Sequence, residues 1–190
     1  MNLRDQILAF VPGNEQEQRD KQELLLWLDS GIDIYSRSCG AAHLTASAWV
    51  VSPDREKVLM AYHSLYDSWA WLGGHADGMT DLQAVARKEV QEESGLTELK
   101  PLGSGIFSLE VLTVDGHEKR GRYVSSHLHL NVTYLFEADP SAPVRPKPDE
   151  NKAVAWFDTE QVLQKSTEPW FCQRIYSKLM DKVRLGAGSR

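Results

Sequence analysis

The stretch that most constrains this chain runs from Leu72 to Leu96, where a glycine turn leads into an amphipathic helix. Gly73 and Gly74 predict a tight turn, and Gly95 predicts the end of the helix. Between them, apolar residues recur at helical spacing and form a single stripe: Leu82, Val85, Ala86 and Val90. This side of the helix is therefore predicted to face the protein interior.

Three glutamates lie close to that apolar stripe. At about 100° per residue, Glu89 and Glu93 fall on the apolar side and Glu92 lies at its edge. Their side chains start about 5–6 Å apart and repel one another, and the helix macrodipole disfavours anions near a C-terminus. A solvated acidic face is the alternative, but the shared apolar side argues against it. We therefore expect a cation among the acids, and oxygen ligands favour Mg²⁺, Mn²⁺ or Ca²⁺.

This segment resembles the Nudix box, G-x5-E-x7-R-E-U-x-E-E-x-G-U, in which U is an aliphatic residue. Gly74 and the run Lys88-Glu89-Val90-Gln91-Glu92-Glu93-Ser94-Gly95-Leu96 match it in register and without a gap. Two positions depart from the pattern, because Thr80 replaces the first Glu and Lys88 replaces the Arg. Asp77 or Asp81 is a candidate to replace the missing acid, and Lys88 or Arg87 the guanidinium.

The resemblance implies an α/β (α+β) protein with the Nudix-type α/β/α sandwich and a mixed β-sheet, to which the sequence adds an N-terminal helical extension that is not part of the Nudix pattern. It implies a pyrophosphohydrolase that cleaves a diphosphate linkage in a small-molecule nucleoside diphosphate derivative, with Mg²⁺ or Mn²⁺ as cofactor. Glu92 and Glu93 are the expected direct metal ligands, beside the Gly73 carbonyl. Glu89 is expected to act as a ligand or as the general base.

Two other functions remain open on the sequence. The changes at Thr80 and Lys88 favour a non-catalytic Nudix-like sensor domain that binds a nucleotide without turnover. A Nudix-type isomerase of a prenyl diphosphate ranks lower, because no cysteine stands near the box. The three retained acids favour the hydrolase.

Length and composition set the outer bounds. A chain of 190 residues with 42% apolar residues is typical of one globular domain. A net charge of -6 argues against a nucleic-acid partner. The absence of a long apolar window and of a signal-peptide pattern predicts a cytoplasmic protein without a membrane partner. Cys39 and Cys172 lie far apart, so neither a disulfide framework nor a zinc site is predicted.

We expect three parts in the chain. Residues 1–40 are predicted to form a helical extension, with one helix from Leu3 to Phe10 and another after Asn14, packed on the domain or forming a homodimer contact. Residues 41–185 are expected to form the Nudix domain, and residues 186–190 a flexible tail. Strands are predicted from Leu44 to Val51, from Lys57 to Tyr62, from Gly103 to Thr113 and from Ala153 to Phe157.

One further strand, from His127 to Phe136, alternates cleanly between apolar and polar residues. Its polar side carries His127, His129, Asn131 and Thr133. If this side turns toward a cleft, His127 and His129 are candidates for substrate binding or proton relay. A solvated face is the alternative.

The remaining candidates lie in loops. Lys119, Arg120 and Arg122 belong to a basic loop that either contacts phosphate oxygens or is simply exposed. Glu118 and Glu150 are candidates for an additional carboxylate that completes the metal site, as the resemblance implies. A closing amphipathic helix is predicted from its apolar residues, which are Phe171, Ile175, Leu179 and Val183.

Overall fold

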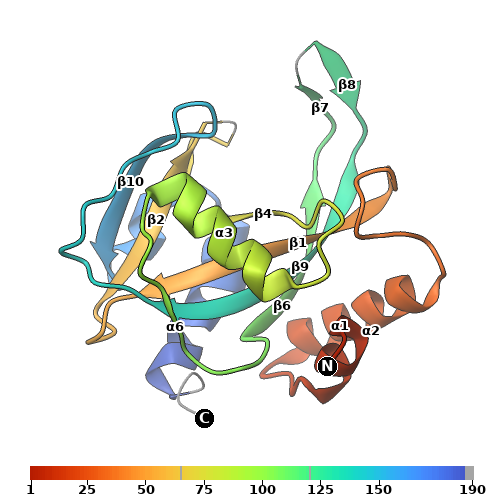
Figure 1. The fold of residues 1–190 in the computed structure, drawn as a ribbon, viewed down its shortest axis with the longest axis horizontal. Coiled ribbons are helices and arrows are strands. Elements are labelled where there is room, and N and C mark those ends of the chain that lie inside the picture. The colour runs from red at the N-terminus through yellow and green to blue at the C-terminus, as the bar shows by residue number, and fades with distance from the viewer. Residues whose placement is uncertain (65, 120, 187–190) are drawn as a thin grey trace.

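The fold is a mixed sheet with helices on both faces (Figure 1). The computed structural model describes residues 1–64, 66–119 and 121–186. Within these residues an eight-stranded sheet has the order β10-β2-β1-β9-β5, while β3 pairs with β2, β4 with β1 and β6 with β9. The strands are β1 (Ala42–Val51), β2 (Lys57–His63), β3 (Ser68–Ala70), β4 (Leu72–His75), β5 (Lys100–Pro101), β6 (Ser108–Val114), β9 (His127–Glu137) and β10 (Asn151–Asp158). The predicted fold class is confirmed.

Strand β1 is the centre of the sheet and is buried along its whole length. It runs parallel to β9, in a register that pairs His43 with His129. It runs antiparallel to β4, where Ser47 is opposite Gly73 and Thr45 is opposite His75. The predicted tight turn at Gly73 and Gly74 is wrong, because both glycines belong to β4 and pair with the middle of the sheet.

Helix α3 (Leu82–Ser94) lies across one face of this sheet (Figure 1). The Asp81 side chain caps its first turn by accepting a hydrogen bond from the Ala84 N–H at 3.0 Å. Gly95 ends the helix at a φ of +75°, a left-handed conformation that glycine adopts without strain. The four residues of the predicted apolar stripe are all buried. The predicted helix and its orientation are thus confirmed.

The N-terminal helices α1 (Leu3–Ala9) and α2 (Glu15–Asp29) pack on the sheet. Leu3, Ile7 and Leu24 are buried and belong to the same apolar core as β1, β9 and α3. Asn14 caps α2, as predicted, by accepting a hydrogen bond from the Glu17 N–H at 2.9 Å.

A buried ionic network ties α2 to strand β6 and to helix α6 (Ser177–Arg184). The Glu17 carboxylate lies 2.6 Å from the Lys182 ammonium and 3.5 Å from that of Lys178. Lys178 also lies 2.9 Å from Glu110 of β6. Because both glutamate side chains are fully buried, the two lysines supply the charge that makes their burial tolerable.

The C-terminal segment covers the opposite face of the sheet (Figure 1). It comprises α4 (Val162–Lys165), α5 (Pro169–Phe171), the π-helical turn η1 (Cys172–Tyr176) and α6. The sequence predicted one regular helix here. In the π-helical turn, the Ser177 N–H bonds the Cys172 carbonyl, a wider spacing than in an α-helix. Ile175 and Leu179 are buried, as the apolar pattern requires.

Two predicted segments were wrong in their extent. The strand predicted from Gly103 begins only at Ser108. Residues 102–105 bend instead, and Gly103 has a φ of +87° within that bend. The loop predicted after Val114 contains a hairpin, β7 (His117–Lys119) and β8 (Arg122–Val124), which projects from the sheet (Figure 1). Among the described residues, no helix combines the length and the apolar character needed to span a bilayer.

Candidate active site

The C-terminal half of α3 packs against the two glycines of β4. The Gly73 N–H donates a hydrogen bond to the Glu93 carboxylate at 3.0 Å. A Cβ atom at Gly74 would lie 2.5 Å from the carboxyl carbon of Glu89, and one at Gly73 would lie 2.6 Å from the Ala46 carbonyl oxygen. Gly73 therefore requires glycine, because a side chain would displace the backbone of β1, whereas a side chain at Gly74 would displace the Glu89 carboxylate.

Glu93 is the most buried acid of this group, with 5% of its surface exposed. Burial raises its pKa to about 8, although the hydrogen bond from Gly73 opposes that shift. Burial also raises the pKa of Glu89, whose side chain is 12% exposed, against the opposing charge of Lys88. Both groups are therefore carboxylates whose negative charge is poorly compensated by the protein itself.

Glu92 differs from its two neighbours because it is paired with lysines. Its side chain is 38% exposed and lies 3.0 Å from Lys88 and 3.1 Å from Lys147. Hydrogen bonds from these two ammonium groups lower the pKa of Glu92. Lys88 also contacts Glu89 at 3.2 Å, so it bridges two of the three acids.

Lys88 is thus the cation that takes the place of the box Arg. Arg87 points elsewhere, since its guanidinium donates to the Leu99 carbonyl at 2.7 Å and lies over the Phe136 ring. Neither acid considered for the position of Thr80 is free for that purpose. Asp81 caps α3, and Asp77 pairs with Arg37 at 2.7 Å.

Glu150 is the carboxylate outside the box that acts on this centre. It lies 2.8 Å from Lys147, and its charge raises the pKa of both Glu89 and Glu93. Glu118 sits instead on the projecting hairpin, opposite Tyr123 and exposed. Arg120 lies outside the described residues. The geometry therefore brings Glu150, but not Glu118, toward the acids of α3.

Asn151 is a positioning residue that the sequence analysis missed. It is 1% exposed, and its side-chain amide donates to the Glu93 backbone carbonyl at 3.0 Å. Its side-chain oxygen accepts a hydrogen bond from the Lys147 N–H at 3.0 Å. Asn151 thereby links the end of α3 to the loop that carries Lys147 and Glu150. No local motif marks this role, because Glu93, its partner on α3, is 58 residues away in the sequence.

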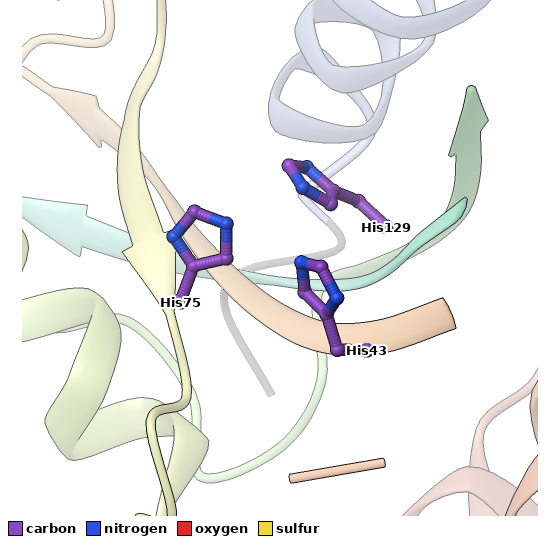
Figure 2. A group of neighbouring side chains, drawn as sticks. All are labelled: His43, His75 and His129. Atoms are coloured by element: carbon purple, nitrogen blue, oxygen red, sulfur yellow. The ribbon is translucent and has the colours of Figure 1, made fainter. Parts of the chain in front are cut away.

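The polar side of β9 is neither a solvated face nor a continuous cleft wall. Asn131 and Thr133 are buried and bond the Glu110 carboxylate, each at 2.8 Å. His129 lies instead among other histidines (Figure 2), with ring centroids 5.0 Å from both His43 and His75.

Burial, reinforced by neighbouring histidines and Lys119, lowers the pKa of His129 to about 2. Burial lowers that of His75 to about 4. The roles of His127 and His129 in substrate binding or proton relay stay predictions.

The acids of α3 fit a hard divalent cation. Glu89 and Glu93 place desolvated carboxylates beside a strand where glycine leaves room for close approach. Carboxylate and backbone carbonyl oxygens are the donors that Mg²⁺ and Mn²⁺ prefer. A cation bound there would supply the charge that no salt bridge supplies to Glu93 among the described residues.

Comparison with known proteins agrees with the family that the sequence motif indicated. The NUDIX domain family model matches residues 41–178. The chain is similar to a NUDIX-family hydrolase from Clostridium perfringens, with 20% identity, a TM-score of 0.51 and coverage of 74% of this chain and 97% of that one.

The chain is also similar to a C. elegans Ap4A hydrolase, with 16% identity, a TM-score of 0.50 and coverage of 76% of this chain and 96% of that one. A third similar structure is the E. coli dihydroneopterin triphosphate pyrophosphohydrolase, with 14% identity, a TM-score of 0.54 and coverage of 73% of this chain and 95% of that one. These structural likenesses show the fold. No curated protein matches the sequence significantly.

Proposed function

The chain belongs to the Nudix family of hydrolases, and from this premise we propose that it cleaves a diphosphate linkage in a nucleoside diphosphate derivative, using Mg²⁺ or Mn²⁺. The observation that carries the proposal is the burial of Glu93 and Glu89 against Gly73 and Gly74. Burying two carboxylates side by side is unfavourable unless a cation joins them. Selection for stability alone does not explain such a pair.

Each residue of the site has a proposed role. Glu93, Glu89 and the Gly73 carbonyl would hold a divalent cation, and Glu92 would join them if its lysines were displaced. When bound, the cation would supply positive charge to phosphate oxygens and a lowered pKa to the attacking water. The Gly73 N–H keeps the Glu93 carboxylate oriented. Glu89 either remains a ligand or accepts the proton of the water, since burial has already raised its pKa.

The lysines suit a phosphate-bearing substrate. Lys88 and Lys147 place two ammonium groups next to the acids, where they attract phosphate oxygens. Two of the similar structures are, by name, an Ap4A hydrolase and a triphosphate pyrophosphohydrolase, which supports a small phosphate-linked substrate.

Three other expectations stay predictions. They are the cytoplasmic location, the homodimer contact and the boundary between the N-terminal extension and the Nudix domain at residues 40 and 41.

The test is a turnover assay with defined substrates. The purified protein is incubated with Mg²⁺, Mn²⁺ or EDTA and a panel of ADP-ribose, dinucleotides, nucleotide sugars and oxidised nucleoside triphosphates. We expect metal-dependent release of phosphate-containing products, and a loss of about 10³-fold in kcat/KM, roughly 4 kcal/mol, for Glu93→Gln. Glu98→Gln, an exposed change beyond the end of α3, is the matched control. Equal turnover by wild type and Glu93→Gln contradicts the proposal.

The second candidate is a nucleotide sensor without turnover. It is favoured by the departures at Thr80 and Lys88 and by the lysine contacts that occupy Glu92. Calorimetry with the same panel distinguishes the two functions, because a sensor binds one compound tightly and releases no product. The burial of Glu89 and Glu93 favours the hydrolase, since a sensor gains nothing from two neighbouring buried acids of which only Glu89 has a lysine partner.

A further inference from the structure

Three histidines from three strands meet at one end of the sheet, outside the acidic site. His43 comes from β1, His75 from β4 and His129 from β9. Parallel pairing puts His43 beside His129, and antiparallel pairing puts His75 opposite Thr45, two residues further along β1. Figure 2 shows the three rings turned toward a shared space. One nitrogen from each ring lies within 4.8 Å of the others.

His43 is the residue whose surroundings call for a ligand. It is 5% exposed, and among the described residues neither of its ring nitrogens has a hydrogen-bond partner of normal geometry. The Cys39 backbone lies near the ring but only partly opposes the effect of burial, which lowers the pKa of His43. Buried polar groups are almost always hydrogen-bonded or bound to a metal. The shared space between the rings is where such a partner fits.

The nearby charged groups do not explain the cluster. The closest acid in the sequence, Asp77, is paired with Arg37 at 2.7 Å. His129 contacts His127, with their Nε2 atoms 3.3 Å apart, so the cluster continues into a fourth histidine. The Asp77 charge only partly opposes the lowering of the pKa of His43 and His75. Within the part of the chain that the structure describes, no carboxylate forms an ion pair with these rings, so packing alone gains little from imidazoles that each carry a nitrogen lone pair.

The donor atoms define the class of ligand. Imidazole nitrogen suits Zn²⁺, Co²⁺, Ni²⁺ and Cu²⁺, whereas Mg²⁺ and Mn²⁺ prefer oxygen. With Zn–N bonds of about 2.0–2.1 Å, the nitrogens of a tetrahedral site lie roughly 3.4 Å apart. The nitrogens here are within 4.8 Å of one another, so side-chain adjustments of about an ångström bring them to that spacing.

We propose that His43, His75 and His129 form a binding site for a transition-metal dication such as Zn²⁺, distinct from the carboxylate site of α3. Three protein nitrogens leave a fourth position for water or for His127, as in zinc sites with an open coordination position. The proposal does not depend on the hydrolase function, because it rests on a different donor set.

The test uses metal-depleted protein and Co²⁺ and Zn²⁺ as probes. We expect one Zn²⁺ per chain by calorimetry and a visible Co²⁺ spectrum typical of nitrogen ligands. Binding should persist in Glu89→Gln/Glu93→Gln, which removes the carboxylate site. It should weaken at least about 100-fold in His75→Asn, at the half-buried edge of the cluster. His63→Asn, a change on β2 outside the cluster, is the matched control.

A measurement on the wild type avoids any dependence on folding of the variants. In nitrogen-15 NMR spectra, Zn²⁺ should shift ring nitrogens of His43, His75 and His129 and leave His63 unchanged. Zn²⁺ binding that is lost in the double glutamine variant but unchanged in His75→Asn overturns the proposal. So does the absence of binding to wild type. Hydrolysis with Mg²⁺ is assayed separately, so failure here leaves the proposed function untouched.

Discussion

Two groups of buried carboxylates in this protein are compensated in different ways. Burial raises the pKa of Glu17, but Lys178 and Lys182 outweigh that effect and the net pKa is lowered. The Glu17 charge is therefore compensated by these two lysines in the folded protein itself. The pKa of Glu93 is raised to about 8, because burial is opposed chiefly by one backbone N–H. Glu93, unlike Glu17, has no ion pair with a lysine among the described residues, and it is the acid proposed above to hold an exchangeable cation.

The largest expected difference is in stability without metal. Glu17→Gln leaves two buried ammonium groups undercompensated and should reduce the free energy of unfolding by about 3–5 kcal/mol. Glu93→Gln should reduce it by less than about 1 kcal/mol or increase it, because an amide is easier to bury than an unpaired carboxylate. Urea unfolding in EDTA measures both. Glu15→Gln, on an exposed side chain at the start of α2, is the control. If Glu17→Gln and Glu93→Gln lose the same free energy of unfolding, the two acids are not compensated in different ways.

The second difference is the response to cations. At a free Mn²⁺ concentration 100 times its dissociation constant, the wild type should gain about 2.7 kcal/mol of stability. Glu17→Gln should show the same gain on a lower baseline, because its network is separate from the acids of α3. Glu93→Gln should show little gain. Unfolding at matched Mn²⁺ concentrations measures the increments, and a full gain in Glu93→Gln removes this residue from the metal site.

The third difference is the sign of the pH dependence. Between the ordinary Glu pKa of 4.5 and about 8, folded metal-free protein holds a proton on Glu93 that the unfolded chain has lost. Stability from this group therefore falls as pH rises through that window, by at most about 1.4 kcal/mol per pH unit, and then levels off. The lowered pKa of Glu17 acts oppositely, since its contribution is lost on acidification.

Unfolding free energies from pH 5 to 9 in EDTA test this sign. The difference between wild type and Glu93→Gln isolates the contribution of this one carboxylate. It should decline with rising pH and become flat at the alkaline end. A difference that is constant or that rises with pH contradicts an uncompensated Glu93.

The smallest expected effect concerns Lys147, which contacts Glu92 at 3.1 Å and Glu150 at 2.8 Å. Because this lysine competes with a cation for the same oxygens, Lys147→Gln should tighten Mn²⁺ binding by about 2–5-fold, or up to 1 kcal/mol. Calorimetry measures the change. Lys152→Gln removes an exposed ion pair with Asp67 and should have no effect. Weaker Mn²⁺ binding in Lys147→Gln means that the lysine positions Glu92 instead.

Much of the site was predictable because its determinants are local. The apolar stripe, the capping residue Asp81 and the stop at Gly95 all act within a few residues, and α3 forms as they predict. Helical spacing also places Glu89 and Glu93 on one side of the helix. The burial of Glu93 follows from the same geometry. The box pattern is also local, and it indicated the fold class because it marks a family whose members share one fold.

The details around the acids were not predictable. The pairing of Glu92 with Lys147 and the bond from Asn151 to Glu93 join segments more than fifty residues apart, and only loop packing decides them. The polar side of β9 illustrates the same limit. Alternation identified the face, but the contact with Glu110 decided that Asn131 and Thr133 are buried.

By itself, the sequence determined the family, the central helix and the three acids, because each depends on spacing within one short continuous segment, from Gly74 to Leu96. The tertiary structure alone decided which acids remain uncompensated and that His43, His75 and His129 meet. Those histidines are far apart in the chain, and strand pairing sets their proximity. A shift of one residue in register would turn His129 to the other face of the sheet.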